Sequence, residues 1–245
     1  MTEPIVGSDR RPRALVIEHD AYTHPALVGE RLELRGYRVV RRLVVPQHRF
    51  HTPDVEHEFP DPGEFDLIVP MGAPWSADDH ETIGSWLTPE LAMLAEAHAR
   101  GIPVLGICFG GQAMSVALGG GVTRSIGWEI GWTDVATADP QLVPAGPWFQ
   151  FHKDAMVLPP GALEVAANRH CSQAWTLGRT LAVQFHPELT LDVLDPWLDH
   201  GGLAVVQQQG IDPERLRVDT LLAEPAARAR THALVDAFLD RVATR

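Results

Sequence analysis

The chain has 245 residues, and its 20 Lys and Arg against 32 Asp and Glu give a formal net charge of −12. Hydrophobic residues make up 45% and charged residues 21%, which is typical of a globular protein and excludes disordered, collagen-like and coiled-coil chains. The acidic balance argues against a general nucleic-acid binder, because phosphate recognition needs clustered Lys and Arg.

The cysteine count and the lengths of the apolar runs indicate the cellular compartment of the protein. The two cysteines, Cys108 and Cys171, are too few for a disulfide framework and fit a reducing compartment. Residues 1–13 lack the apolar core of a secretory signal, and no apolar run reaches the roughly 18 residues that a membrane span needs. We therefore predict a cytoplasmic protein that does not contact membranes.

The first half of the chain alternates short apolar runs with helical patterns. The second of the helices should begin with Thr88 as N-cap and Pro89 at its first position. Such alternation indicates right-handed crossovers and a parallel sheet with helices on both faces. Strands are expected over residues 13–18, 37–45, 65–70 and 103–108, helices over 25–35, 88–100 and 109–118, and a loop over 47–64.

After Gly119 the pattern changes to short strands divided by Gly and Pro turns, which suggests an antiparallel extension. We detect no internal repeat and no domain boundary, so residues 1–245 are predicted to be one α/β domain. Its core should cover about residues 13–200, with a helical C-terminal extension over about 201–245. Strands are expected over 133–137, 148–151, 163–168 and 181–185, and helices over 192–199 and 225–241.

The most informative segment is Gly106-Ile-Cys-Phe-Gly110, which has the spacing of a nucleophile on a strand-to-helix turn. The turn is sharp, so the residues two positions either side of the nucleophile must be small. A sulfur at a helix N-terminus is also favoured as the thiolate. The alternative is a buried, inert cysteine at a strand end, but the flanking glycines favour Cys108 as a nucleophile.

A thiolate nucleophile needs a base, and the base needs a group that orients it. The apolar run that ends in His186 is followed two residues later by Glu188, and an i, i+2 pair in extended chain projects to the same side. A strand end followed by a turn would explain these residues equally well on their own. Together with the Cys108 turn, however, a Cys–His–Glu arrangement is the better interpretation.

A tetrahedral intermediate also needs hydrogen-bond donors for its oxygen. The N–H of Phe109 lies next to the nucleophile, and Gly72, which follows another apolar strand, is the expected second donor. His152 and Asp154 are candidate pocket residues, although a strand-to-turn hydrogen bond would explain them as well. His48, His51 and His57 match no standard metal-site spacing, so we predict no metal.

Residues 106–112 and the segment Gln184-Phe-His-Pro-Glu188 together resemble the class I (triad) glutamine amidotransferase family. Residues 71–74 stand where that family has its Gly-Gly-Pro oxyanion loop. Residues 151–154 are similar to a His-Gly-Asp segment in relatives of the GMP synthetase amidotransferase domain. The resemblance covers roughly residues 13–200 and implies a flavodoxin-like amidotransferase fold.

The resemblance implies that Cys108 attacks the side-chain amide of L-glutamine, that His186 moves the proton and that Glu188 orients His186, with no cofactor. It also implies a substrate-binding set of Gln112, Trp128, Glu129, Ile130 and Gly131. The leading hypothesis is a glutaminase whose ammonia serves a partner synthetase subunit. Two alternatives stay open: a hydrolase of γ-glutamyl peptides or amines, and a regulatory protein active only with a partner. The sequence also allows a homodimer.

Overall fold

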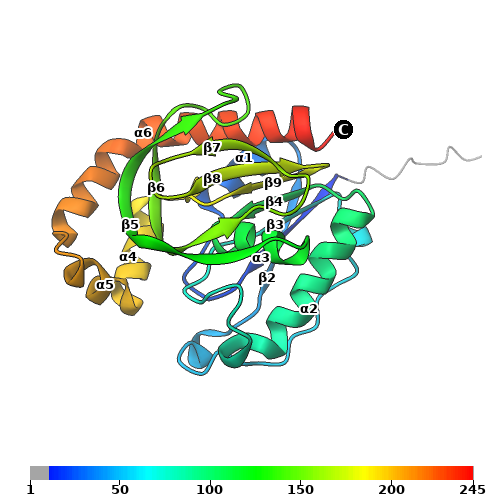
Figure 1. Ribbon diagram of the computed structural model, residues 1–245, viewed down its shortest axis with the longest axis horizontal. Coiled ribbons are helices and arrows are strands. Elements are labelled where there is room, and N and C mark those ends of the chain that lie inside the picture. The colour runs from blue at the N-terminus through cyan, green and yellow to red at the C-terminus, as the bar shows by residue number, and fades with distance from the viewer. Residues whose placement is uncertain (1–10, 245) are drawn as a thin grey trace, which may run out of the picture.

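The computed structural model describes residues 11–244, apart from the side chain of Ile126. In this part of the chain one nine-stranded sheet has the order β2-β1-β3-β4-β9-β8-β7-β5-β6 (Figure 1). Its strands are β1 (Arg13–Glu18), β2 (Arg38–Leu43), β3 (Leu67–Pro70), β4 (Val104–Ile107), β5 (Gly121–Thr137), β6 (Gly146–Val157), β7 (Leu163–Ala167), β8 (Ser172–Leu177) and β9 (Thr180–Val183).

The helices lie along and around this sheet (Figure 1). The α-helices are α1 (Ala26–Leu34), α2 (His80–Ala99), α3 (Phe109–Ala117), α4 (Leu191–Trp197), α5 (Leu203–Gln208) and α6 (Pro213–Ala237). Shorter turns are the 3₁₀ segments η1 (Gln47–Arg49) and η2 (Pro62–Glu64) and the π-type segments η3 (Leu198–Gly202) and η4 (Phe238–Val242). No helix among the described residues is long and apolar enough to cross a bilayer.

The half of the sheet from β2 to β9 is parallel, as predicted. Strand β1 shows why helices cover both faces of the sheet. Its successive side chains point to opposite faces, and the apolar ones on each face must be buried. Ala14 and Val16 pack in the cluster that holds Leu32 of α1 and Leu234 of α6. Leu15 and Ile17 pack in the cluster of α2 and α3. The predicted α/β class with a parallel core is therefore confirmed.

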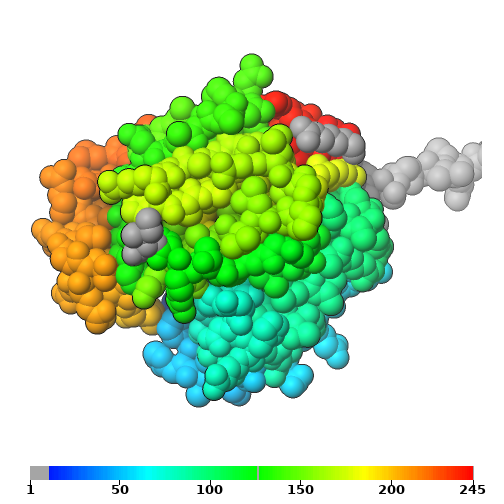
Figure 2. All heavy atoms as spheres, viewed as in Figure 1, coloured from blue at the N-terminus to red at the C-terminus, as the bar shows by residue number. Residues whose placement is uncertain are grey.

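The other half of the sheet, from β9 through β8, β7 and β5 to β6, is antiparallel, which confirms the predicted extension. Strands β5 and β6 are much longer than expected and form a curved ribbon (Figure 1). The ribbon bends where the register shifts between Arg124 and Glu129. In the space-filling view, the antiparallel strands cover the upper and central part of the visible face, between the orange residues of α5 and α6 and the blue-green residues of α2 (Figure 2).

Two helix starts were predicted wrongly. Helix α2 begins at His80, where Asp79 accepts a hydrogen bond from the Thr82 N–H at 3.0 Å, and Pro89 lies inside it. Helix α6 begins at Pro213 and contains Pro225 in the same way. In both helices the predicted start falls at a proline that lies inside the observed helix, because packing of the apolar face carries the helix across that proline. Strand β8 was not predicted, and α5 lies within the predicted helical C-terminal extension but was not predicted as a separate helix.

Candidate active site

Cys108 lies between β4 and α3 on the turn that the glycine spacing predicts. Its φ of 49° and ψ of −108° are a strained conformation for a residue with a side chain. The strain is held in place by contacts on both sides of the turn. A Cβ on Gly106 would lie 2.8 Å from the Gly110 carbonyl oxygen, and a Cβ on Gly110 would lie 2.0 Å from that of Pro70. Glycine at both positions therefore lets strand and helix meet.

His186 and Glu188 follow β9 and lie together as the i, i+2 spacing indicated. The Nδ1 atom of His186 is 2.8 Å from Oε1 of Glu188. The backbone N–H of His186 donates a hydrogen bond to the backbone carbonyl of Phe149 at 2.9 Å, which ties this segment to β6. Because Nδ1 faces a carboxylate, the neutral ring carries its proton there and keeps the Nε2 lone pair for another group.

The Nε2 atom of His186 is buried and has no hydrogen-bond partner among the residues that the structure describes. Cys108 and His186 are each only 4% exposed, and Glu188 is fully buried. Burial alone lowers the pKa of His186, but the neighbouring charges of Cys108 and Glu188 outweigh it and raise this pKa to about 10. The surroundings of His186 therefore favour the charged, protonated form of its ring.

Gly72 lies in the loop after β3, close to the side chains of His186 and Cys108. A Cβ built on Gly72 would be 3.0 Å from Cε1 of His186 and 3.9 Å from Cβ of Cys108. Phe109 opens helix α3 and is buried. The Gly110 N–H donates to the carbonyl of Met71 at 3.0 Å, so the loop and the helix start are linked directly.

A buried pair that the sequence did not reveal anchors the same loop. The His19 ring, after β1, places Nδ1 3.2 Å from the Gly72 carbonyl oxygen and Nε2 2.9 Å from Oε1 of Glu90 in α2. Both side chains are fully buried. Burial lowers the pKa of His19, but the Glu90 carboxylate outweighs this, so the net direction is upward. The His19 ring therefore ties the Gly72–Ala73 peptide to helix α2.

We expect the His19→Leu variant to lose about 3–5 kcal/mol of unfolding free energy, because Glu90 would remain as an unpaired buried charge. The double variant His19→Leu/Glu90→Leu should recover much of that loss, since no charge is then left buried. Urea denaturation of the three proteins measures both effects. A double variant that is less stable than the single one would contradict the assignment of an ion pair.

The predicted substrate-side residues fall into two groups. Gln112 and Trp128 line a cavity next to Cys108. Gln112 also donates through Nε2 to the Asp154 carbonyl at 3.2 Å and to Oε1 of Gln184 at 3.3 Å. Gln184 in turn lies 3.7 Å from the Cys108 sulfur.

Glu129, Ile130 and Gly131 are not among the residues that line the cavity. Ile130 packs in the cluster beside α4, and Gly131 adopts a φ of 97° against Leu216. Glu129 is buried and accepts hydrogen bonds from Asn168 and, at 3.2 Å, from Gln173. Their predicted contact with substrate therefore stays a prediction.

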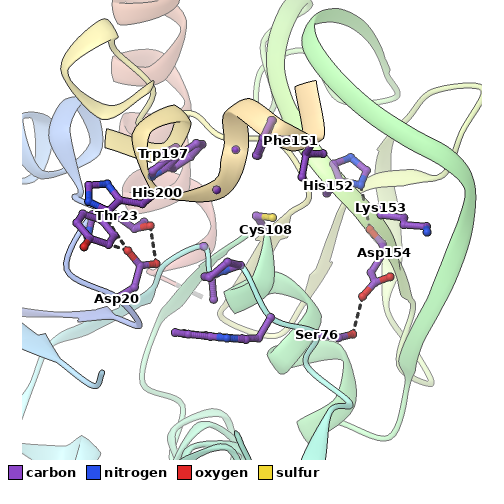
Figure 3. A pocket seen from close by; sticks show the side chains of 18 of the residues that line it. Asp20, Thr23, Ser76, Cys108, Phe151, His152, Lys153, Asp154, Trp197 and His200 are labelled. Carbon is purple, nitrogen blue, oxygen red and sulfur yellow. Dashed lines mark hydrogen bonds between the residues drawn. The ribbon is translucent and has the colours of Figure 1, made fainter. Parts of the chain in front are cut away.

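The cavity has a volume of about 670 Å³ and opens over Cys108 (Figure 3). Sequence reasoning identified several of its residues but missed its walls, which include Asp20, Tyr22, Ser76, Trp197 and His200. Asp20 and Tyr22 follow β1 and Ser76 follows β3, so the carboxyl ends of parallel strands were the signal that could have located them. Trp197 and His200 carry no such signal.

His152 and Asp154, the weaker pocket candidates, do line the cavity. Nδ1 of His152 is 2.9 Å from the Asp154 carbonyl, a contact between two residues of β6 rather than the strand-to-turn bond of the alternative interpretation. The Asp154 carboxylate accepts from Ser76 at 2.5 Å and from Arg124 at 2.8 Å. Both residues thus lie on the cavity wall, and a role for them in binding stays a prediction.

The second cysteine lies in different surroundings. Burial, with the nearby Glu129 charge, raises the pKa of Cys171 to about 12, so its sulfur stays protonated. Among the described residues, Glu129, His152 and Cys171 form a cluster with the composition of a metal site. Nε2 of Gln173 lies 3.2 Å from Glu129 and 3.4 Å from the Cys171 sulfur, so hydrogen bonding accounts for the cluster.

Comparison with known proteins identifies a matching family and several relatives. The family model "Glutamine amidotransferase class-I" matches residues 36–198. The GMP synthase [glutamine-hydrolyzing] of Aeropyrum pernix is 39% identical over 111 residues, 40% of this chain and 22% of that protein. The enzyme with the same name from Yersinia enterocolitica serotype O:8 is 31% identical over 156 residues, 57% of this chain and 27% of that protein. The chain thus spans about a quarter of the length of these relatives.

Solved structures share the fold at lower sequence identity. A glutamine amidotransferase from Thermotoga maritima aligns with a TM-score of 0.80 and 23% identity, over 94% of this chain and 99% of that one. A glutamine amidotransferase from Methylobacillus flagellatus aligns with a TM-score of 0.75 and 22% identity, over 94% and 95% of the two chains. At these identities the similarity concerns the fold.

Proposed function

The chain belongs to the class I glutamine amidotransferase family, and on that premise we propose that it hydrolyses the side-chain amide of L-glutamine to glutamate and ammonia. The observation that carries the proposal is the buried contact of His186 with Glu188 beside the strained Cys108 turn, at the floor of an open cavity. This arrangement unites a candidate nucleophile with an oriented base at the cavity.

In the proposed reaction the Cys108 sulfur attacks the amide carbon and forms a thioester. The C–N bond breaks as His186 gives its proton to the departing nitrogen, which leaves as ammonia. Water then attacks the thioester and gives a proton back to His186, and the carbon–sulfur bond breaks to release glutamate. Glu188 keeps the imidazole in the required tautomer and stabilises its charged form.

Further groups have proposed roles in the same steps. The N–H groups of Gly72 and Phe109 would hold the oxygen of the tetrahedral intermediate, each worth on the order of 10²–10³ in rate. Gln112 would contact the substrate from the cavity wall. No step needs a metal ion or an organic cofactor.

We expect kcat/KM to fall as the pH rises through about 10, because His186 then loses the proton that it must give to the leaving nitrogen. In the Glu188→Gln variant this fall should come at lower pH, since one of the charges that raise the pKa of His186 is gone. Profiles of kcat/KM against pH for both proteins provide the measurement. An alkaline limb that does not move in the variant would contradict the role of Glu188.

We also expect the Glu188→Gln variant to retain more activity than His186→Ala. The orienting group does not itself transfer the proton, whereas removal of His186 removes both the base and the acid. Steady-state kcat values of the two variants, measured under the same conditions, test this order. Equal losses, or a greater loss for Glu188→Gln, would count against it.

For the partner, we propose a synthetase subunit that consumes the ammonia, in the cytoplasm. Support comes from the curated relatives, which are named as glutamine-hydrolysing GMP synthases and are about four times the length of the aligned segment. A second candidate, hydrolysis of γ-glutamyl peptides or amines, is favoured by the cavity volume of about 670 Å³. Volumes of about 300–1,000 Å³ suit drug-sized ligands, which are larger than glutamine.

The test is ammonia release from glutamine, with and without candidate synthetases, together with labelling by an electrophilic glutamine analogue. Activity and a label on Cys108 are expected. Activity that appears only with a partner would favour the regulatory alternative. Absence of both activity and label with every partner tried would overturn the proposed function.

A further inference from the structure

The cavity over Cys108 has two chemically different sides (Figure 3). Ser76, Lys153 and Asp154 lie on one side of the cysteine, and Thr23, Trp197 and His200 lie on the other. We call the first the ionic side, defined by Ser76, Arg124, Lys153 and Asp154. We call the second the aromatic side, defined by Tyr22, Phe50, Trp75, Trp197 and His200.

The ionic side suits the charged end of an amino acid. Arg124 and Lys153 are the two Arg or Lys side chains among the cavity-lining residues, and Arg124 pairs with Asp154 at 2.8 Å. The two cations can take an α-carboxylate. Each oxygen of the Asp154 carboxylate accepts one bond, from Arg124 or from Ser76, and keeps a second lone pair for an α-ammonium group. A γ-glutamyl group therefore has its charge complement on this side.

In the described part of the chain, the aromatic side lacks Arg and Lys side chains that could pair with the α-carboxylate of a γ-glutamyl group. The rings of Tyr22 and His200 are stacked with their centroids 3.6 Å apart. Tyr22 meets Phe50 at 5.2 Å, and Phe50 meets Trp75 at 6.0 Å, so the rings form a continuous wall.

Asp20, the carboxylate on this side, is already satisfied within its own loop. It accepts from the N–H groups of Tyr22 and Thr23 at 2.7 and 3.0 Å and from the Thr23 hydroxyl at 3.0 Å. The groups left to contact a ligand on this side are therefore mainly the faces and edges of the aromatic rings.

The position of His186 assigns the leaving group to the aromatic side. Its ring packs edge-to-face against Trp197, with centroids 4.7 Å apart. Since His186 gives its proton to the departing nitrogen, whatever substituent that nitrogen carries leaves next to Trp197 and the stacked rings. Tyr22 and His200 both lie outside residues 36–198, which the family model matches. The stacked pair of the aromatic side thus comes from segments on both sides of the matched region, whereas Phe50, Trp75 and Trp197 lie within it.

We propose that the preferred substrate is a γ-glutamyl amide whose amine carries an aromatic group, with the γ-glutamyl end on the ionic side and the aryl amine on the aromatic side. This inference rests on the proposed thioester chemistry of Cys108. The reaction balances as hydrolysis: the amide C–N bond breaks, the nitrogen takes a proton from His186 and leaves as a free amine. Water then releases glutamate from the thioester and restores the proton.

The experiment compares kcat/KM for L-glutamine, for γ-glutamyl-p-nitroanilide and for glutaryl-p-nitroanilide, which lacks the α-ammonium group. We expect the γ-glutamyl anilide to exceed glutamine by about tenfold or more, in the range that apolar pockets discriminate. It should also exceed the glutaryl anilide. The Tyr22→Ala variant should lower the anilide-to-glutamine ratio by about tenfold. The Tyr37→Phe variant, at a tyrosine that does not line the cavity, should leave the ratio unchanged.

The outcomes separate this inference from the proposed glutaminase function. Hydrolysis of glutamine with an anilide no better than glutamine, or a ratio that Tyr22→Ala does not change, would overturn the aryl-amine inference and leave the glutaminase proposal intact. Hydrolysis of the anilide without that of glutamine would support the inference and overturn the glutaminase proposal. Turnover of neither amide, with no label on Cys108, would overturn both.

Discussion

The Gly110→Ala variant is expected not to fold, or to lose more than about 4–5 kcal/mol of unfolding free energy, which is exceptional for a single substitution. A Cβ at this position would lie 2.0 Å from the carbonyl oxygen of Pro70 and 2.5 Å from its carbonyl carbon. Pro70 ends the buried strand β3, whose four residues are all buried between helices. The obstacle is backbone in the sheet, so no side-chain rotation can relieve it.

A matched control comes from a glycine in another helix. A Cβ on Gly84, in α2, would meet its nearest atom at 3.7 Å, an ordinary contact. Gly84→Ala should therefore be neutral or stabilise by up to about 1 kcal/mol, the difference in helix propensity. Circular dichroism and urea denaturation of both variants give the comparison. A Gly110→Ala protein as stable as the parent would show that the turn is looser than described.

The second large effect is expected from Cys108→Ala, which should lower kcat for amide hydrolysis by about 10⁶-fold, as loss of the nucleophile does in triad hydrolases. The protein should stay folded, because a Cβ is present in both residues and the turn is held by its glycines rather than by the sulfur. Ammonia release measures the loss, and thermal denaturation checks the fold.

The chain supplies its own control, because it has only one other cysteine. Cys171→Ala should retain most of the activity, since burial keeps that thiol protonated and it does not line the cavity. Substantial turnover by Cys108→Ala, or a larger loss in Cys171→Ala, would refute the assignment of the nucleophile.

The fold was predictable where its signals are local. Short apolar runs and the helical stretches between them predicted the parallel strands, because a buried strand must be apolar on both faces. The prolines misled the prediction at α2 and α6, where tertiary packing holds a helix across Pro89 and Pro225. The lengths of β5 and β6 also escaped prediction, since pairing with each other keeps their mixed sequences extended.

The candidate site also combines local features that could be predicted with contacts between distant segments that could not. The Cys108 turn and the His186–Glu188 contact involve residues within a few positions of one another, and short-range backbone geometry decides such contacts. The His19–Glu90 pair and the Tyr22–His200 stack join distant segments. No spacing in the sequence marks either of them.

By itself, the sequence determined the α/β class, the strained turn that presents Cys108 and the histidine–carboxylate pair, because each depends on a repeating or adjacent pattern of residue types. Only the tertiary structure decided which loop anchors Gly72, which rings wall the cavity and on which side of Cys108 the charges gather. These features depend on strand order and on how the two ends of the chain pack over the sheet, and that information is spread over contacts between residues far apart in the sequence.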